Sequence, residues 1–300
     1  MFTKRHEGEL LEIRELTHAL DEQLREALEL SRRIREGYVF EDAYSRLSDG
    51  SAGGLAESER ESIGEAIEAL AARYGLEEEI TRRLQRLVWL VDWGRANFVP
   101  SAGASGAPAD PRGIREPSRR IALSTLADSL AGLELELVRS ARRIGDIGSG
   151  AGFPGLVLAV ALPEARMTLI EKVPERCAFL RHATKELGLD NVEVFEGNAQ
   201  EWSEGLGACD VVTSRKVGRI HTTLEWAAPL LAPAGSVALF PGTTDFAQDG
   251  PAAAAPVAEA LGLALAKALP VRSENRRGEP IVKHLYVYCR NVPGSERQGK

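Results

Sequence analysis

The stretch RRIGDIGSGAGFPGLVLAV, residues 142–160, decides the fold of this chain. It begins as a short buried strand, turns through closely spaced glycines and continues into an apolar helix. Pro154 is expected in the first turn of that helix, where a missing N–H costs nothing. This order of strand, glycine-rich turn and helix is typical of the first unit of a doubly wound α/β sheet.

The glycines in this stretch are compatible with two different cofactors. Gly150, Gly152 and Gly155 form the G-x-G-x-x-G of a dinucleotide site, which is weak evidence alone. Asp146, with Gly148, Gly150 and Gly152, forms the D-x-G-x-G-x-G of an S-adenosylmethionine site. A carboxylate at position 146 would repel a pyrophosphate but would attract a ligand that carries a sulfonium and an ammonium group. The sequence therefore favours the methyl donor over the dinucleotide.

A second acidic residue supports a nucleoside-containing ligand. Glu171 ends the next predicted strand, residues 166–172, where a carboxylate can accept hydrogen bonds from ribose hydroxyls. Asn198 and Arg215 end later strands, and the carboxyl ends of parallel strands meet at one edge of the sheet. The two carboxylates also have plainer structural interpretations: Asp146 can be a turn or helix-capping residue, and Glu171 can be a surface residue.

Composition limits the classes of function. The 300 residues carry a net charge of −7 and are 44% hydrophobic. No run reaches the roughly 18 apolar residues of a membrane span, and the charged start lacks a signal-peptide core. The cysteines at 177, 209 and 289 include no C-x-x-C pair, so neither a disulfide framework nor a metal site is expected. We expect a cytoplasmic protein without a membrane partner.

The chain divides by pattern into four parts. Residues 1–75 form an N-terminal helical extension, whose heptad-like segment 8–36 offers a possible helix-mediated contact. Residues 76–135 form a helical, substrate-side region with a mobile loop at 100–118 and a helix at 121–138. Residues 136–292 form a mostly parallel, Rossmann-like methyltransferase core, and 293–300 a tail. Before the core, helices are also expected at 57–73 and 76–95. Within the core, further strands are expected at 192–198, 209–215, 235–242 and 284–290. The core helices are expected at 175–189 and 251–268.

The core resembles one family. DIGSGAGFPGLVLAVALPEARMTLIEKVPERCAFLR, together with DVVTSRKVG and VKHLYVYCR, resembles the RsmG or GidB family of small-subunit rRNA guanine-N7 methyltransferases, over roughly residues 76–290. That family typically reads D-x-G-S-G-x-G-F-P-G in its loop. On the substrate side the chain departs from it: Ser124 and Thr125 replace an Arg-His pair, Asn198 replaces Arg, and Lys216 replaces Ala. The spacing of Trp93 and Asn97 is one residue short.

The resemblance implies roles for particular residues. Arg215 would be catalytic, lying between donor and target. Asn97, in a segment that resembles the family, is a candidate for contact with substrate. Arg176 and Lys216 are further candidates as basic residues near the expected site, not by resemblance. The residues implied to bind the cofactor are Asp146, Gly148, Gly150, Gly152, Phe153, Glu171, Asn198, Ala199 and Gln200.

The resemblance implies methyl transfer to N7 of a guanine in small-subunit rRNA, with rRNA or the small ribosomal subunit as partner. Guanine N7 carries an unprotonated lone pair, so attack on the methyl group needs no general base, and the sequence shows no Ser-His-Asp arrangement. Positioning and a favourable field would supply the rate. Two alternatives stay open. One is a methyltransferase acting on another RNA or on a small molecule, the latter favoured by the acidic net charge and the missing Arg-His pair, and the other is a non-catalytic module.

Overall fold

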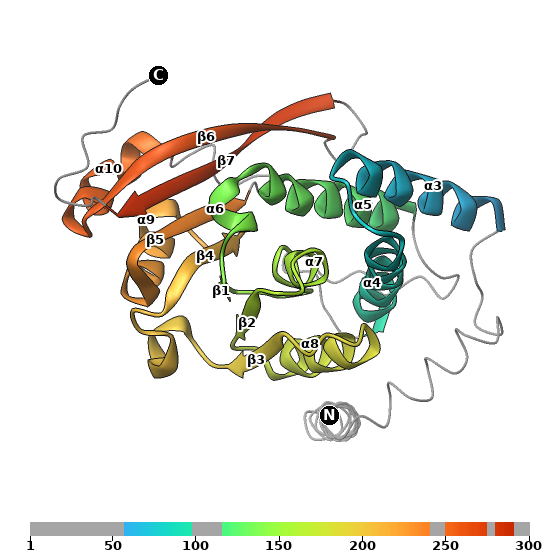
Figure 1. Cartoon of the computed structure of the whole chain (residues 1–300), viewed down its shortest axis with the longest axis horizontal. Coiled ribbons are helices and arrows are strands. Elements are labelled where there is room, and N and C mark those ends of the chain that lie inside the picture. Colours follow the sequence, from blue (N-terminus) through green and yellow to red (C-terminus); the bar gives the residue numbers. More distant parts are fainter. Residues whose placement is uncertain (1–56, 98–115, 241–249, 275–279, 291–300) are drawn as a thin grey trace, which may run out of the picture. The chain divides into compact units, whose positions relative to one another are not determined.

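A seven-stranded sheet organises the part of the chain that the structure, a computed structural model, describes: residues 57–97, 116–240, 250–274 and 280–290. The strands lie in the order β3-β2-β1-β4-β5-β7-β6. The first five run parallel, while β7 runs antiparallel to both β5 and β6 (Figure 1). The strands are β1 (Arg143–Ile147), β2 (Arg166–Glu171), β3 (Val192–Glu196), β4 (Cys209–Arg215), β5 (Leu231–Phe240), β6 (Leu263–Glu274) and β7 (Pro280–Arg290).

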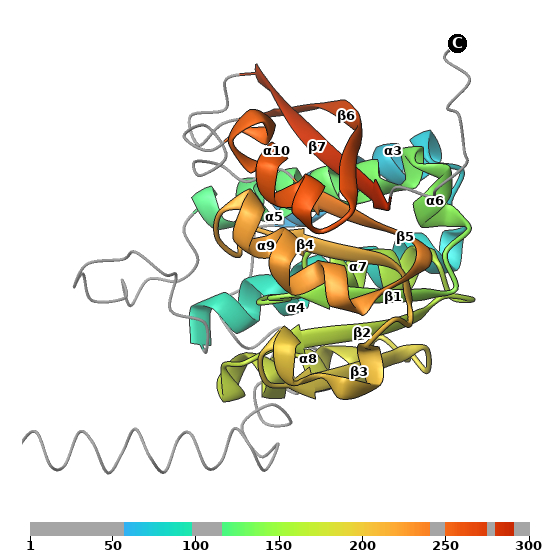
Figure 2. The same ribbon diagram turned by 90° about the vertical axis from the view of Figure 1, so that its left-hand side faces the viewer.

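Helices cover both faces of this sheet. On one face lie α4, α5, α7 and α8, and on the other lie α9 and α10 (Figures 1 and 2). The helices are α3 (Glu57–Arg73), α4 (Glu78–Asn97), α5 (Glu116–Leu130), α6 (Glu136–Arg139), α7 (Gly155–Ala161), α8 (Pro174–Glu186), α9 (Ile220–Ala227) and α10 (Pro251–Ala260), with short 3₁₀ turns η1 (Ala131–Glu134), η2 (Ala199–Glu201), η3 (Ser203–Gly205) and η4 (Ala228–Leu230). Helix α3, from within the predicted N-terminal extension, packs against α4 and α5.

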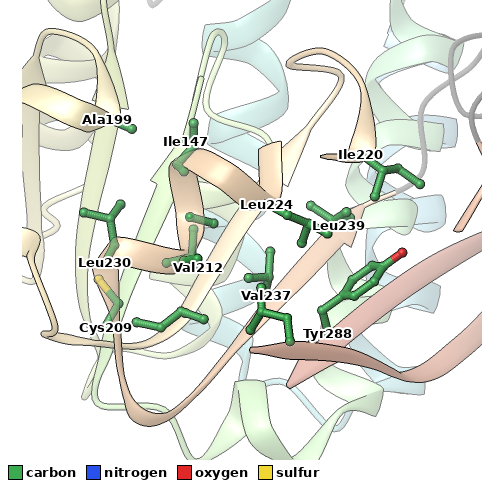
Figure 3. Packing of buried hydrophobic residues seen from close by; sticks show 14 of the residues in the cluster. Ile147, Ala199, Cys209, Val212, Ile220, Leu224, Leu230, Val237, Leu239 and Tyr288 are labelled. Carbon is green, nitrogen blue, oxygen red and sulfur yellow. The ribbon is translucent and has the colours of Figure 1, made fainter. Parts of the chain in front are cut away.

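Burial of apolar side chains fixes the sheet between these layers. Val212 of β4, Val237 of β5 and Tyr288 of β7 pack with Ile220 and Leu224 of α9 (Figure 3), and each is fully or almost fully buried. At about 1.5–3 kcal/mol for each large side chain, this burial holds α9 in place. The carboxyl ends of β1, β2 and β4 are thereby set at one edge of the sheet.

The expected fold class is confirmed: a doubly wound, mostly parallel α/β sheet with helices before it in the chain. The prediction of a helix over 251–268 is wrong in its second half. Helix α10 ends at Ala260, Gly262 has a φ of +68°, and β6 begins at Leu263. Alanine-rich sequence favours a helix locally, but pairing with β7 overrides that preference.

Three further expectations need correction. The helix expected at 121–138 starts earlier, at Glu116, and breaks at Leu130 into η1 and α6. Residues 116–118 of the expected loop therefore belong to α5, and 100–115 lie outside the described residues. Pro154 stands at the N-cap of α7, one position before its first turn.

Two more expectations concern the segment 8–36 and membrane-spanning helices. The segment 8–36 lies outside the described residues, so its predicted contact stays a prediction. None of the helices in the described ranges is both long and apolar enough to cross a membrane.

Candidate active site

The glycine-rich loop forms a backbone cradle between β1 and α7. Gly148, Gly150 and Gly152 have φ values of +69°, +56° and +89°, a region that residues with a Cβ rarely adopt. A Cβ on Gly148 would stand 2.3 Å from a methyl carbon of Val217. At Gly150, its chain neighbours aside, the one atom of the described residues within 4 Å of such a Cβ is Gly148 O, at 3.7 Å. The middle of the loop therefore has room for a close-lying ligand.

Asp146 lies beneath this loop with no exposed surface. Its Oδ1 accepts a hydrogen bond of 2.7 Å from the Thr213 hydroxyl, while Oδ2 is buried without a hydrogen bond of normal geometry. Burial raises the pKa of Asp146 to about 6, against hydrogen bonds from Thr213, Ser149 and the Gly155 backbone that lower it. Because Asp146 has no exposed surface, its charge would act on a ligand from below the loop.

Glu171 holds the loop to the end of β2. Its Oε2 accepts the Gly150 N–H at 2.9 Å, and its Oε1 accepts the N–H groups of Lys172 and Val173. A carboxylate offers about four acceptor positions, and three are occupied here. One acceptor position is left for a ribose hydroxyl, and a second would require one of the three N–H groups to leave Glu171.

The residues after β3 divide between surface and core. Asn198 caps η2 in a reciprocal pair with Glu201. Gln200 is exposed, whereas Ala199 is buried in the core cluster around β4 and β5. Phe153, at the other end of the glycine loop, is also buried, with 6% of its surface exposed.

Arg215 ends β4 and reaches toward α5. Its side chain is 9% exposed; Nη2 lies 3.4 Å from the Thr125 hydroxyl and 3.8 Å from Asp128 Oδ2. Asp128 also accepts a 2.9 Å hydrogen bond from Lys283 of β7. Arg215 therefore stands at the carboxyl edge of the sheet within a buried polar network.

The three candidate substrate residues lie on different elements. Arg176, in the first turn of α8, is 28% exposed and 3.8 Å from Glu171 Oε2. Lys216 is exposed and has a φ of +61°, the one positive φ among described residues other than glycine. Such backbone strain, of order 1–3 kcal/mol, is often found at functional sites. Asn97 is the last residue of α4.

Sequence reasoning did not identify several residues that shape this site. Val217 packs against Gly148, Thr213 binds Asp146, and Asp128 and Lys283 meet beside Arg215. Thr213 is a hydroxyl residue within a strand that is buried from Val211 to Ser214, and a polar residue in such a strand is a signal that could have identified it. Nothing local to the sequence brings residues 128 and 283 together. Within the described ranges no group of three or more His, Cys, Asp or Glu side chains could hold a metal ion.

The sequence of this chain matches a known protein family. The family model described as rRNA small subunit methyltransferase G, or GidB, matches residues 113–256. The Wolinella succinogenes protein named ribosomal RNA small subunit methyltransferase G is 35% identical over 167 residues, which are 55% of this chain and 77% of that protein. The Mycobacterium leprae protein of the same name is 44% identical over 109 residues, 36% of this chain.

The extent of these matches differs. The alignment spans 44% of the M. leprae protein, less than half of its length. The crystal structure of precorrin-6y C5,15-methyltransferase from Geobacter metallireducens is 20% identical, with a TM-score of 0.43, covering 56% of this chain and 87% of that one. The Wolinella alignment covers more than three quarters of its relative. The chain belongs to the rRNA small subunit methyltransferase G family.

Proposed function

We propose that this chain transfers a methyl group from S-adenosylmethionine to N7 of a guanine in small-subunit rRNA. The observation that carries the proposal is the cradle of Gly148, Gly150 and Gly152 above the buried carboxylate of Asp146, in a chain of this family. We further propose that the protein works in the cytoplasm with rRNA or the small subunit as its partner. The segment 8–36 is a candidate for an additional contact.

The residues around the loop fit a cationic methyl donor. A buried carboxylate with one incompletely satisfied oxygen is costly, and a nearby positive charge lowers that cost. Gly150 leaves space above the loop, and Glu171 lies at its rim. The donor, when bound, supplies an electrophilic methyl group. The three glycines would contact its methionine portion, with the charge of Asp146 beneath them, and Glu171 would bind the ribose. Residues near the adenine would be Phe153, Asn198, Ala199 and Gln200.

The remaining side chains have to bind and orient the guanine. Because N7 has no proton to lose, no side chain needs to act as a base, and the barrier is lowered by alignment and electrostatics. Arg215 can donate hydrogen bonds to guanine O6 or to a phosphate beside the target. Asn97, Arg176 and Lys216 would contact the RNA around it.

The experiment is methyl transfer from radiolabelled donor to free small-subunit rRNA, to assembled small subunits and to a panel of metabolites. Borohydride reduction followed by aniline cleavage locates 7-methylguanine, and RNA carrying 7-deazaguanine at that position should accept no methyl group. Arg215→Ala should lower transfer at least a hundredfold while the affinity for adenosylhomocysteine stays unchanged. Transfer to a metabolite and not to RNA would instead support the small-molecule alternative.

A further inference from the structure

Two loops leave the sheet side by side where β1 and β4 end. Ile147, the last residue of β1, pairs with Ser214 of β4, and the Ser214 hydroxyl donates to Ile147 O at 3.0 Å. The glycine loop starts after Ile147. Residues 216–218, which we call the β4–α9 turn, start after β4 and lead toward α9. The pairing of the two strands therefore sets the two loops next to each other.

Val217 joins these two loops by direct packing. A Cβ on Gly148 would stand 2.3, 2.8 and 3.2 Å from Cγ2, Cγ1 and Cβ of Val217, so the branched end of this side chain lies on the Gly148 backbone. Val217 also packs against the buried cluster that contains Ile220 and Leu224 of α9. The side chain therefore contacts both the first glycine of the cradle and the apolar core.

The neighbours of Val217 in the turn are exposed and have positive φ values. Lys216 has a φ of +61° and Gly218 one of +124°, and both are exposed, as is Arg219 after them. A non-glycine residue in the left-handed region costs about 1–3 kcal/mol, so the surrounding structure has to hold it there. Val217 is half-buried between these two residues. Its packing on Gly148 therefore sets where the backbone that carries Lys216 and Arg219 lies.

The glycine loop is held from its other side by β2. The N–H groups of Gly148 and Ser149 donate to Ile170 O at 2.8 and 3.1 Å, and the Gly150 N–H donates to Glu171. A donor bound against the glycines would restrain the same backbone further. Because Val217 is in close contact with Gly148, a restraint on that glycine is transmitted to the β4–α9 turn.

We infer that Val217 is a positioning residue that couples the donor site to the RNA side of the active site, so that donor and rRNA bind cooperatively. A bound donor restrains Gly148, Gly148 restrains Val217, and the β4–α9 turn is then already ordered when the RNA binds. Coupling between two binding sites is reciprocal, so bound RNA raises the affinity for the donor by the same factor. This inference rests on the proposed function, because it concerns how the donor loop prepares the surface that would meet the RNA.

The test is the coupling factor, which is the ratio of the dissociation constants for a small-subunit rRNA fragment without and with saturating adenosylhomocysteine. In the full-length wild-type protein this factor should be at least about five. Val217→Ala removes both γ carbons from the contact and should lower the factor below about two, while the affinity for adenosylhomocysteine alone changes less than about threefold. Val217→Ile keeps both γ carbons on Gly148 and should keep most of the factor. The matched control is Val192→Ala, the same substitution at a half-buried position at the amino end of β3, which should leave the factor unchanged.

A merely structural role predicts a different result. In that case Val217→Ala would lower the free energy of unfolding and weaken the binding of both ligands alike, with the coupling factor as in wild type. That result overturns the inference, as does a factor near one in the wild-type protein. A factor in Val192→Ala as low as in Val217→Ala would also overturn it, because the effect would then not be specific to the contact with Gly148.

Amide hydrogen exchange separates this inference from the proposed function. In the wild-type protein, adenosylhomocysteine should slow exchange at residues 216–219 at least about fivefold, and in Val217→Ala less than about twofold. If the wild-type protein binds no rRNA, the proposed function fails while this experiment still tests the coupling through Val217. Unchanged exchange at residues 216–219 in wild-type protein saturated with adenosylhomocysteine would refute the coupling itself, whether or not Val217→Ala folds.

Discussion

At the scale of single residues, the glycines of the loop serve two separable purposes. Gly148 must lack a Cβ because Val217 packs against it, at 2.3 Å from the position a Cβ would take. Gly150 also has a positive φ but open space beside it. One position is therefore demanded by packing within the protein, and the other leaves room for a ligand.

Paired substitutions can separate these purposes. Gly148→Ala should destabilise the fold by about 2–4 kcal/mol, since overpacking adds to backbone strain. Gly150→Ala should cost only about 1 kcal/mol of stability but weaken donor binding at least tenfold. Urea denaturation and calorimetric titration with adenosylhomocysteine measure the two effects. Val217→Ala should recover part of the stability lost in Gly148→Ala; no recovery would mean that the contact does not limit the loop.

Asp146 makes stability depend on pH with a definite sign. Its pKa rises from 3.8 in the unfolded chain to about 6 in the folded protein, chiefly through burial. The folded state therefore binds the proton more tightly, and the stability this gives below pH 4 is lost as pH rises through about 6. The loss by pH 7 is about 3 kcal/mol, at 1.36 kcal/mol per pKa unit.

Asp146→Asn tests this dependence. Relative to wild type, the unfolding free energy of the variant should improve by about 2 kcal/mol between pH 4 and pH 7, because the amide stays neutral throughout. Urea denaturation across that range measures the difference, with Asp190→Asn at an exposed position as the control for the substitution. A difference that stays constant with pH would show that Asp146 does not carry this cost.

At the scale of elements, some assignments were available from sequence and others were not. Strand β1 and the glycine loop are specified locally, by a short segment with Ile144 and Ile147 followed by glycines at fixed spacing. Strand β6 is not: its alanines favour a helix, and only pairing with β7 makes it a strand. The contact of Asp128 with Lys283 joins positions 155 residues apart, so no local pattern predicts it.

The end of α7 depends on a side chain from another element. Asn191, just before β3, donates from Nδ2 to the carbonyl oxygens of Ala159, Leu162 and Ala165, at 3.1, 3.3 and 3.0 Å. Two of these carbonyls lie at the C-terminal end of α7, where helix carbonyls lack partners within the helix. Asn191 therefore ties that helix end to the entry of the sheet.

Asn191→Ala should lower the unfolding free energy by about 1–3 kcal/mol, because buried carbonyls lose their donor. Asn191→Asp should cost at least as much, since a carboxylate faces the same oxygens. Because this position lies at the amino end of the strands, away from the glycine loop, donor affinity should stay within twofold of wild type. Chemical denaturation and donor titration check both parts, and a large loss of affinity without a loss of stability would contradict the assignment.

At the scale of the whole molecule, the balance of charge conflicts with a polyanionic substrate. The net charge is −7, and many arginines are already paired with carboxylates, among them Arg73 with Glu134 and Arg181 with Glu196. Phosphate contacts supply most non-specific affinity for RNA. Under the proposed function, we expect the attraction to rRNA to come from a few cations near the carboxyl edge of the sheet, and not from the overall field.

A small number of phosphate contacts predicts that the affinity for RNA depends weakly on salt concentration. The plot of log affinity against log salt should be shallow, with a slope no steeper than about −4, because few phosphates are contacted. Arg176→Gln should weaken binding to all RNA sequences alike and make the slope about 0.7–0.9 shallower, the loss of one phosphate contact. Arg139→Gln is the matched control, since Arg139 pairs with Glu136 on α6, before β1. Filter binding to a small-subunit rRNA fragment between 50 and about 300 mM salt measures the slope. A steep slope in wild type, or one that Arg176→Gln leaves unchanged, would show that the RNA is held by cations elsewhere on the chain.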